Sequence, residues 1–291
     1  AFKDLANPAI GANYDSQLWK ALALAREHKW ADAREKFKNV QFAITALPID
    51  LQRPIVADAM RASLEVKDYS GAAARSSDLD AIGIPDEMKP EITVMRGRLS
   101  EALGRDKDAL AQFEEVMASP DREAAAEAQI HDIALRQKHN EINQQDALHD
   151  LETLSVMWRG DALEVQTLQM LQALYTDTGR YAEALAVSRT ATKLQPNSAV
   201  SRQIQDAASA LFTQLFLTTK GDDLPPVDAL AMFYDYRDLT PIGRRGDEMI
   251  RRLADRLVGV DLLDQAADLL QYQVDHRLEG AARAQVAARL A

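Results

Sequence analysis

Residues 163–198 read LEVQTLQMLQALYTDTGRYAEALAVSRTATKLQPNS, and this stretch decides the fold. Its first half places large apolar side chains three and four residues apart, the spacing of one helical face: Leu168, Leu171, Leu174 and Tyr175. Gly179 follows where helices commonly end, because glycine adopts the left-handed conformation of the C′ position without strain. Helical spacing resumes through Ala184 and Leu194 until Pro196, which cannot continue a helix. The stretch therefore predicts two helices joined by a short turn.

The second helix of this hairpin carries a small residue, Ala184, shortly after the turn. A small residue lets two antiparallel helices approach closely, and the residue four positions later fills the groove beside it. The arrangement recurs along the chain, with the small residue at Ala33, Ala72, Ala109, Ala147, Ala184, Ala229 and Ala266. The intervals are 39, 37, 38, 37, 45 and 37 residues. A near-constant period of this size is typical of stacked helical hairpins, each of which buries its apolar face against its neighbours.

At these positions the hairpin resembles the tetratricopeptide repeat, through Leu168, Leu171, Tyr175, Gly179, Tyr181, Ala184, Ala191 and Pro196. It departs from that family where Leu168 replaces the usual tryptophan, Gln172 the first glycine and Ser188 the second aromatic residue. The unit at 90–120 matches more weakly through Gly97, Gly104, Ala109, Phe113 and Pro120. The unit near Asp247 matches through Ile250, Leu253, Ala254, Leu257, Ala266 and Leu270. The others match mainly at the small residue. Because the period exceeds the family's roughly 34 residues, we expect extended turns between helices.

The resemblance implies an all-α fold, a right-handed superhelical solenoid of stacked antiparallel helical hairpins with about seven repeats. Two stretches interrupt the pattern, TTKGDDLPPVD from Thr218 and TPIGRRGD from Thr240, because their prolines and glycines cannot continue a helix. We therefore expect a repeat array over 1–219, an irregular repeat with Pro/Gly-rich loops over 220–246, and truncated C-terminal repeats over 247–291. The chain begins without methionine and ends in what resembles half a hairpin, so we interpret it as a fragment of a larger protein.

Composition excludes several classes of function. The formal net charge is -11 and there is no cysteine, which argues against nonspecific nucleic-acid binding and excludes disulfides, thiolate catalysis and cysteine-ligated zinc. No apolar run has the length needed to span a bilayer, so we expect no membrane insertion. We expect a soluble protein of the bacterial cytoplasm or periplasm; the absence of cysteine fits either compartment.

Arginines at one repeat position form the first candidate site. Aligning the units on their small residues places Arg61, Arg98 and Arg136 at the same position of three consecutive first helices, which line the concave groove in tetratricopeptide arrays. A planar guanidinium donates paired hydrogen bonds to carboxylates, so the three would bind an acidic peptide or a chain-terminal carboxylate. In the alternative interpretation they pair with Glu101, Asp132 and other nearby acids on solvated helix faces.

The irregular repeat supplies the second candidate site. The sequence FYDYRDLTPIGRRGDEM combines aromatic residues with arginines, the composition of binding hot spots: Phe233, Tyr234, Tyr236, Arg237, Arg244 and Arg245. A loop that interrupts a repeat array often lies on its binding face. In the alternative interpretation the aromatic rings fill the gap left by the imperfect repeat and the arginines pair with Asp235, Asp238 and Asp247.

No catalytic motif is present. The chain has five histidines and lacks the HExxH, GxSxG, Walker A and GxGxxG patterns, so we expect no catalytic residue, metal ion or cofactor. The sequence favours a non-enzymatic scaffold that binds a protein or peptide in its concave groove. Two alternatives stay open: a structural segment that self-associates end to end, and the substrate-docking region of a larger enzyme.

Overall fold

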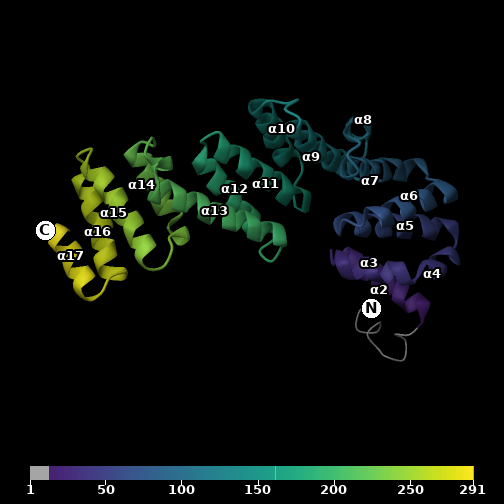
Figure 1. The fold of residues 1–291 in the computed structure, drawn as a ribbon, viewed down its shortest axis with the longest axis horizontal. Coiled ribbons are helices and arrows are strands. Elements are labelled where there is room, and N and C mark those ends of the chain that lie inside the picture. Colours follow the sequence, from purple (N-terminus) through teal and green to yellow (C-terminus); the bar gives the residue numbers. More distant parts are fainter. Residues whose placement is uncertain (1–12, 161, 291) are drawn as a thin grey trace. The chain divides into compact units, whose positions relative to one another are not determined.

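The computed structural model describes residues 13–160 and 162–290 (Figure 1), so the first twelve residues of the predicted array lie outside it. Within these ranges the regular secondary structure is helical, without a strand. The chain divides into two compact units, Ala1–Asn143 and Gln144–Ala291. The boundary separates the two helices expected to form the hairpin of Ala147 and lies inside the predicted 1–219 array.

The first unit is a series of antiparallel helix pairs. Its elements are α2 (Tyr14–Arg26), α3 (Trp30–Asn39), α4 (Gln41–Thr45), α5 (Ile49–Glu65), α6 (Tyr69–Ile82), η1 (Asp86–Met88), α7 (Lys89–Ala102), α8 (Asp106–Met117) and α9 (Arg122–Lys138). Helix α2 packs on α3, α5 on α6 and α7 on α8, while α3 packs on α5, α6 on α7 and α8 on α9. The first helices of successive hairpins, α5, α7 and α9, also contact one another, so they form one continuous face, called here the first-helix face.

The second unit continues the pattern with one irregular part. Its elements are α10 (Gln144–Met157), α11 (Ala162–Asp177), α12 (Tyr181–Leu194), α13 (Ala199–Leu217), η2 (Thr219–Gly221), α14 (Pro226–Asp235), η3 (Arg237–Leu239), α15 (Arg244–Val258), α16 (Leu263–His276) and α17 (Gly280–Leu290). Helix α11 packs on α12 and α15 on α16, and α13 lies between these hairpins because it contacts both α12 and α15. The predicted irregular repeat contains the short α14 and η3.

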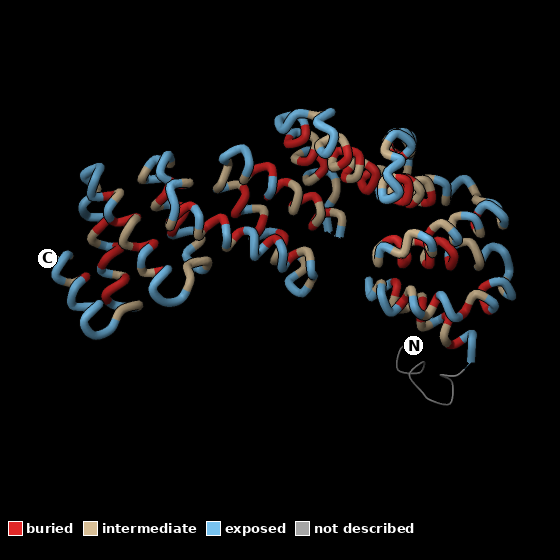
Figure 2. Tube along the Cα trace, viewed as in Figure 1, coloured by how far each residue is buried: buried red, intermediate tan, exposed pale blue. Residues whose placement is uncertain are grey.

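The small residue of each repeat is buried, as its packing role requires. All seven alanines at this position are at most 2% exposed. Buried residues lie where paired helices face one another, and exposed residues lie at the turns and outer faces (Figure 2). The sequence period thus corresponds to helix-helix packing, and the all-α fold of stacked, tetratricopeptide-like hairpins is confirmed.

The turns inside the hairpins share one conformation. A residue with positive φ lies five positions before the small residue in five of the described hairpins: His28 (57°), Lys67 (61°), Gly104 (72°), Gly179 (78°) and Asp261 (62°). The next amide N–H then bonds back to the first helix, as when Arg105 N donates to Ser100 O at 2.8 Å and Arg180 N to Tyr175 O at 2.8 Å, which satisfies a carbonyl left open at the helix end. The turns of these five hairpins span three or four residues, whereas the segment between α9 and α10 spans five, residues 139–143. The long period therefore comes partly from this segment and partly from the connections between hairpins, where α4 and η1 lie.

A second pair of positions is matched in size in two of the hairpins, α7–α8 and α11–α12. A Cβ on Gly97 of α7 would lie 2.4 Å from the ring of Phe113 of α8, so glycine is what leaves space for this ring. At the same two positions of the α11–α12 hairpin the sizes are reversed: buried Gln172 donates to Ser188 Oγ at 2.7 Å and to Ile204 O at 2.9 Å. The two departures from the tetratricopeptide pattern therefore compensate each other.

Candidate functional site

Two of the three predicted arginines meet at one carboxylate. Arg61 of α5 donates through Nη1 to both oxygens of Glu127 of α9, at 3.1 and 3.0 Å. Arg98 of α7 donates through Nη1 to Glu127 Oε1 at 2.8 Å. Each arginine has a further partner, Arg61 with Glu91 at 3.3 Å and Arg98 with Glu65 at 2.7 Å. We call these five residues the Glu127 cluster; it joins the three helices of the first-helix face.

Glu127 is the buried centre of the cluster, with 5% of its surface exposed. Burial by itself raises the pKa of a carboxyl group, but the charges of Arg61 and Arg98 outweigh burial here and hold the pKa of Glu127 below its usual value. Two guanidinium groups face three carboxylates, so the arginines are already neutralised. Their first role in this arrangement is to fasten neighbouring hairpins together.

Arg136 does not join this cluster. It donates to Asp132 Oδ2 at 2.8 Å and pairs with Glu114 of α8. The pairing with Asp132 is the one given by the alternative interpretation, whereas Glu101 faces His131, with 3.4 Å between Oε2 and Nδ1. The structure thus brings together two members of the expected ladder and places the third in a separate ion pair.

Asp58, in the same region, is a carboxyl group whose ionised form is unfavourable. Burial and the neighbouring Glu91 raise its pKa to about 6, and Arg26 and Arg61 offset only part of this effect. The group therefore changes charge near neutral pH, beside the edge of the Glu127 cluster.

A pocket of about 340 Å³ opens beside Arg98, where α5, α7 and α9 approach their C-terminal ends. Ionisable side chains of both signs line it, namely Glu65, Lys67, Arg98, Glu101, His131 and Lys138. Leu64 and Tyr69 add apolar surface. This combination can receive a polypeptide segment with a charged side chain, because a short apolar wall positions the chain and the ionisable groups select it.

The irregular repeat of the second unit divides its predicted site residues between core and surface. Phe233 is 2% exposed and packs against Phe212 and Phe216, with ring centroids 5.8 and 5.4 Å apart. It stands four residues after Ala229, the groove-filling position of the repeat, so the period itself indicates a core role. Phe233 therefore faces the core rather than a partner, as in the alternative interpretation.

The remaining residues of this segment reach the surface. Tyr234 is 40% exposed, and Arg237, Arg244 and Arg245 are exposed. Tyr236 is half-buried under the Arg189 guanidinium, which lies 4.3 Å from its ring centroid. A pocket of about 130 Å³ lies next to this pair, between α12, α13 and η3.

The part of the chain that the structure describes contains no group of three or more histidine, cysteine, aspartate or glutamate side chains arranged to hold a metal ion. None of its helices combines the length and apolar character needed to cross a bilayer. Sequence reasoning missed Glu127. Its signal is the stretch REAAAEAQI, where a lone acid on an alanine-rich, buried face requires a cationic partner.

Comparison with known proteins gives likenesses of structure only. No protein-family model matches the chain, and no curated protein sequence is similar to it. The apo form of the quorum sensor NprR from B. thuringiensis is similar over 95% of this chain and 79% of its own, with 14% identity and a TM-score of 0.49. The C-terminal part of a TPR repeat-containing protein from Cytophaga hutchinsonii is similar over 92% of this chain and 98% of its own, with 13% identity and a TM-score of 0.48. A tetratricopeptide repeat protein from Parabacteroides merdae covers 95% of this chain and 98% of its own, with 12% identity and a TM-score of 0.40.

Proposed function

We propose that this chain is a non-enzymatic scaffold that binds a peptide segment of a partner protein on its first-helix face. The observation that supports the proposal is the pocket beside Arg98, because cationic, anionic and apolar side chains of this face line it together. The partner segment contributes a charged side chain to this pocket and lies along α5, α7 and α9.

The Glu127 cluster refines the electrostatic part of this proposal. Arg61 and Arg98 already have carboxylate partners, so an acidic ligand gains from Arg98 only by displacing Glu65. The exposed Lys67 lacks this competition and lies in the wall of the pocket. Lys67 is therefore the better cation for a ligand carboxylate, while Arg61 and Arg98 hold the face in shape.

The exposed side chains of the irregular repeat are proposed as a second contact, confined to the second unit. Arg244 and Arg245 stand in the first turn of α15. Cations at a helix N-terminus oppose the helix dipole, so an acidic group of a partner would relieve an unfavourable arrangement there. Tyr234 and Arg237 extend this surface. On the first unit, we propose Arg136 of α9 as a further partner contact at the edge of the first-helix face.

The experiment is peptide selection followed by affinity measurement. Random 12-residue peptides displayed on phage are selected against the full chain, and the dissociation constant of a selected peptide is measured by fluorescence polarisation. We expect Lys67→Glu to weaken binding about fivefold, the effect of losing one exposed charge contact, and the matched control Lys107→Glu to leave it within twofold.

Selection of no peptide, together with light-scattering masses that grow with concentration, would refute the binding role and support self-association. Equal weakening by Lys67→Glu and Lys107→Glu would place the peptide elsewhere. A selected peptide that is weakened only by Arg244→Glu/Arg245→Glu would move the site to the second unit.

A further inference from the structure

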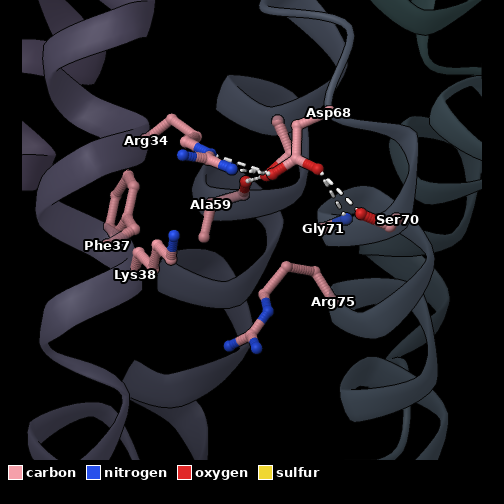
Figure 3. A pocket seen from close by; sticks show the side chains of 9 residues that line it. Arg34, Phe37, Lys38, Ala59, Asp68, Ser70, Gly71 and Arg75 are labelled. Carbon is pink, nitrogen blue, oxygen red and sulfur yellow. Dashed lines mark hydrogen bonds and ion pairs between the residues drawn. The ribbon is translucent and has the colours of Figure 1, made fainter.

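A different face of the first unit contains a pocket of about 340 Å³ between α3, α5 and α6 (Figure 3). Arg34 of α3 spans its upper edge and donates to Asp68 Oδ2 through Nε at 2.8 Å and Nη2 at 2.6 Å. The other oxygen of Asp68 accepts the Gly71 N–H at 3.0 Å and so caps α6. Asp68, the only carboxylate among the described residues that line the pocket, therefore has hydrogen-bond partners on both oxygens.

Two further cations project into the space below this pair. Lys38 comes from α3 and Arg75 from α6, and Figure 3 shows their side chains extending from the two opposing helices. Arg75 pairs with Asp78 of its own helix, at 3.1 Å. Lys38 is exposed, and within the described residues its side chain forms neither a hydrogen bond nor an ion pair. Three cations thus line the pocket against one carboxylate, in a chain whose net charge is -11. Outside the lining, Arg34 also pairs with Glu35 and Arg75 with Asp78, so Lys38 is the cation of this pocket that has no partner among the described residues.

The next hairpin repeats this pocket. A cavity of about 420 Å³ lies between α6, α7 and α8. It is lined by residues that stand 37 positions after those of the first pocket: Arg96, Ser100, Arg105, Asp108 and Gln112 follow Ala59, Ser63, Asp68, Gly71 and Arg75. The two spaces therefore occupy equivalent places between consecutive second helices.

In both pockets the lining has more cationic than anionic side chains, although the cations stand at different positions of the repeat. Arg96 and Arg105 line the second pocket, against one carboxylate, Asp108. Arg96 is held by Ser76 and Asp80, at 3.0 and 2.6 Å. Arg105 is exposed and, like Lys38, its side chain has no partner among the described residues. Each pocket thus offers one unpaired cation beside one or more anchored arginines.

These pockets do not belong to the first-helix face. Ala59 and Ser63 line the first pocket, whereas Arg61 of the same helix belongs to the Glu127 cluster. Successive residues of an α-helix are about 100° apart, so residues two positions apart point in nearly opposite directions. The same holds on α7, where Arg96 lines the second pocket and Arg98 belongs to the cluster. The pockets consequently open on the other side of α5 and α7, called here the second-helix face.

We propose that the second-helix face is a distinct binding surface for an acidic peptide, which places one carboxylate in each of the two pockets. The two pockets flank α6, because Arg75 of this helix lines the first and Ser76 the second. A helix with its side chains is roughly 10 Å wide, a distance that about three residues of extended chain span. The preferred ligand is therefore an extended segment with two glutamates or aspartates separated by two or three residues. Lys38 and Arg105 attract the carboxylates, and Arg75 and Arg96 orient them.

The test uses the full chain and fluorescein-labelled ten-residue peptides with two glutamates separated by two or three serines, with lysine-for-glutamate versions as probes of charge. Binding is followed by fluorescence polarisation at several salt concentrations. We expect Lys38→Glu and Arg105→Glu each to weaken binding about fivefold, and the double variant more strongly. The matched controls, Lys36→Glu on α3 and Lys107→Glu on α8, introduce the same charge outside both pockets and should change affinity less than twofold.

Equal loss in pocket variants and controls would overturn the proposal, because it would show attraction by overall charge alone. Equal binding of an oligonucleotide of the same charge, with the same dependence on the two pocket cations, would also overturn it. Loss of binding in Lys67→Glu with no effect of Lys38→Glu or Arg105→Glu would assign the peptide to the first-helix face instead, so the two proposed surfaces can fail separately.

Discussion

Replacement of Glu127 by glutamine tests whether the Glu127 cluster holds the first unit together. The change preserves the shape of the side chain and removes the charge that faces Arg61 and Arg98 at 2.8–3.1 Å. Removing one partner of a buried ion pair costs about 3–5 kcal/mol. Here the arginine side chains are 23% and 16% exposed and each keeps a second carboxylate, so we expect a loss of about 2–3 kcal/mol.

A loss of this size lowers the Tm of a unit of this length by roughly 5–12 °C. Urea unfolding followed by circular dichroism gives the free energy, and hydrogen-deuterium exchange locates the loss. Protection should fall in peptides from α5, α7 and α9 and stay unchanged in the second unit. The matched control is Glu115→Gln on α8, an exposed carboxylate outside the cluster.

The dependence on pH supplies an independent check. Because the folded-state pKa of Glu127 is lowered from 4.5, its stabilising effect is complete above the unfolded-state value and is lost as pH falls through the folded-state value. The difference between the native chain and Glu127→Gln should therefore persist at neutral pH and shrink below pH 4.5. A variant that unfolds within about 0.5 kcal/mol of the native chain at pH 7 would refute the assignment of the cluster as an inter-hairpin fastening.

Four further substitutions, in three experiments, examine other parts of the molecule. Gly97→Ala should destabilise the first unit by about 1–3 kcal/mol in urea unfolding, because the new methyl group overlaps the Phe113 ring; an unchanged midpoint would contradict the close approach. Gln172→Gly and Ser188→Phe should each destabilise the α11–α12 hairpin, whereas the double variant should lose at least about 1 kcal/mol less than the sum in a double-mutant cycle; additive losses would show that the two positions are not matched. Asp58→Asn should stabilise the chain at pH 7.5, because a carboxyl whose folded-state pKa is raised to about 6 contributes most to stability when protonated and loses that contribution as pH rises. This gain in stability should disappear in melting curves recorded near pH 4. A gain independent of pH would exclude titration as its cause.

The positions of the hairpins were predictable because one small residue per repeat is enough to reveal the period. Burial of Phe233 was predictable as well, since it stands four residues after Ala229. Its sequence neighbours Tyr234 and Tyr236 stand at other positions of the repeat, Tyr236 just beyond the end of α14. A composition argument that groups all three rings together misses this distinction.

The partners of Arg61 and Arg98 could not be predicted in the same way, whereas Asp132, four residues before Arg136 on the same helix, was named as a partner by the alternative interpretation. The chain contains 45 acidic residues, and a repeat alignment places Arg61 and Arg98 without stating which carboxylate lies opposite. Glu127 stands 66 residues from Arg61, so their contact depends on how the helices of three hairpins stack. The cationic pockets were missed for a related reason: their lining residues come from three helices, and their cations occupy different positions in the two repeats.

The size matching between Gly97 and Phe113, and between Gln172 and Ser188, occurs within single hairpins. Each of these two hairpins therefore contains both residues of this contact, and a larger residue on one helix is matched by a smaller one on its partner helix. Such a hairpin can be duplicated, deleted or exchanged as one cassette without disturbing this contact. The Glu127 cluster has the opposite property, because its members come from three consecutive hairpins and only that order assembles it. For anyone who builds new arrays from this chain, the α11–α12 hairpin should move together with α13, because Gln172 also donates to Ile204 O of that helix. Helices α5 to α9 must likewise move together.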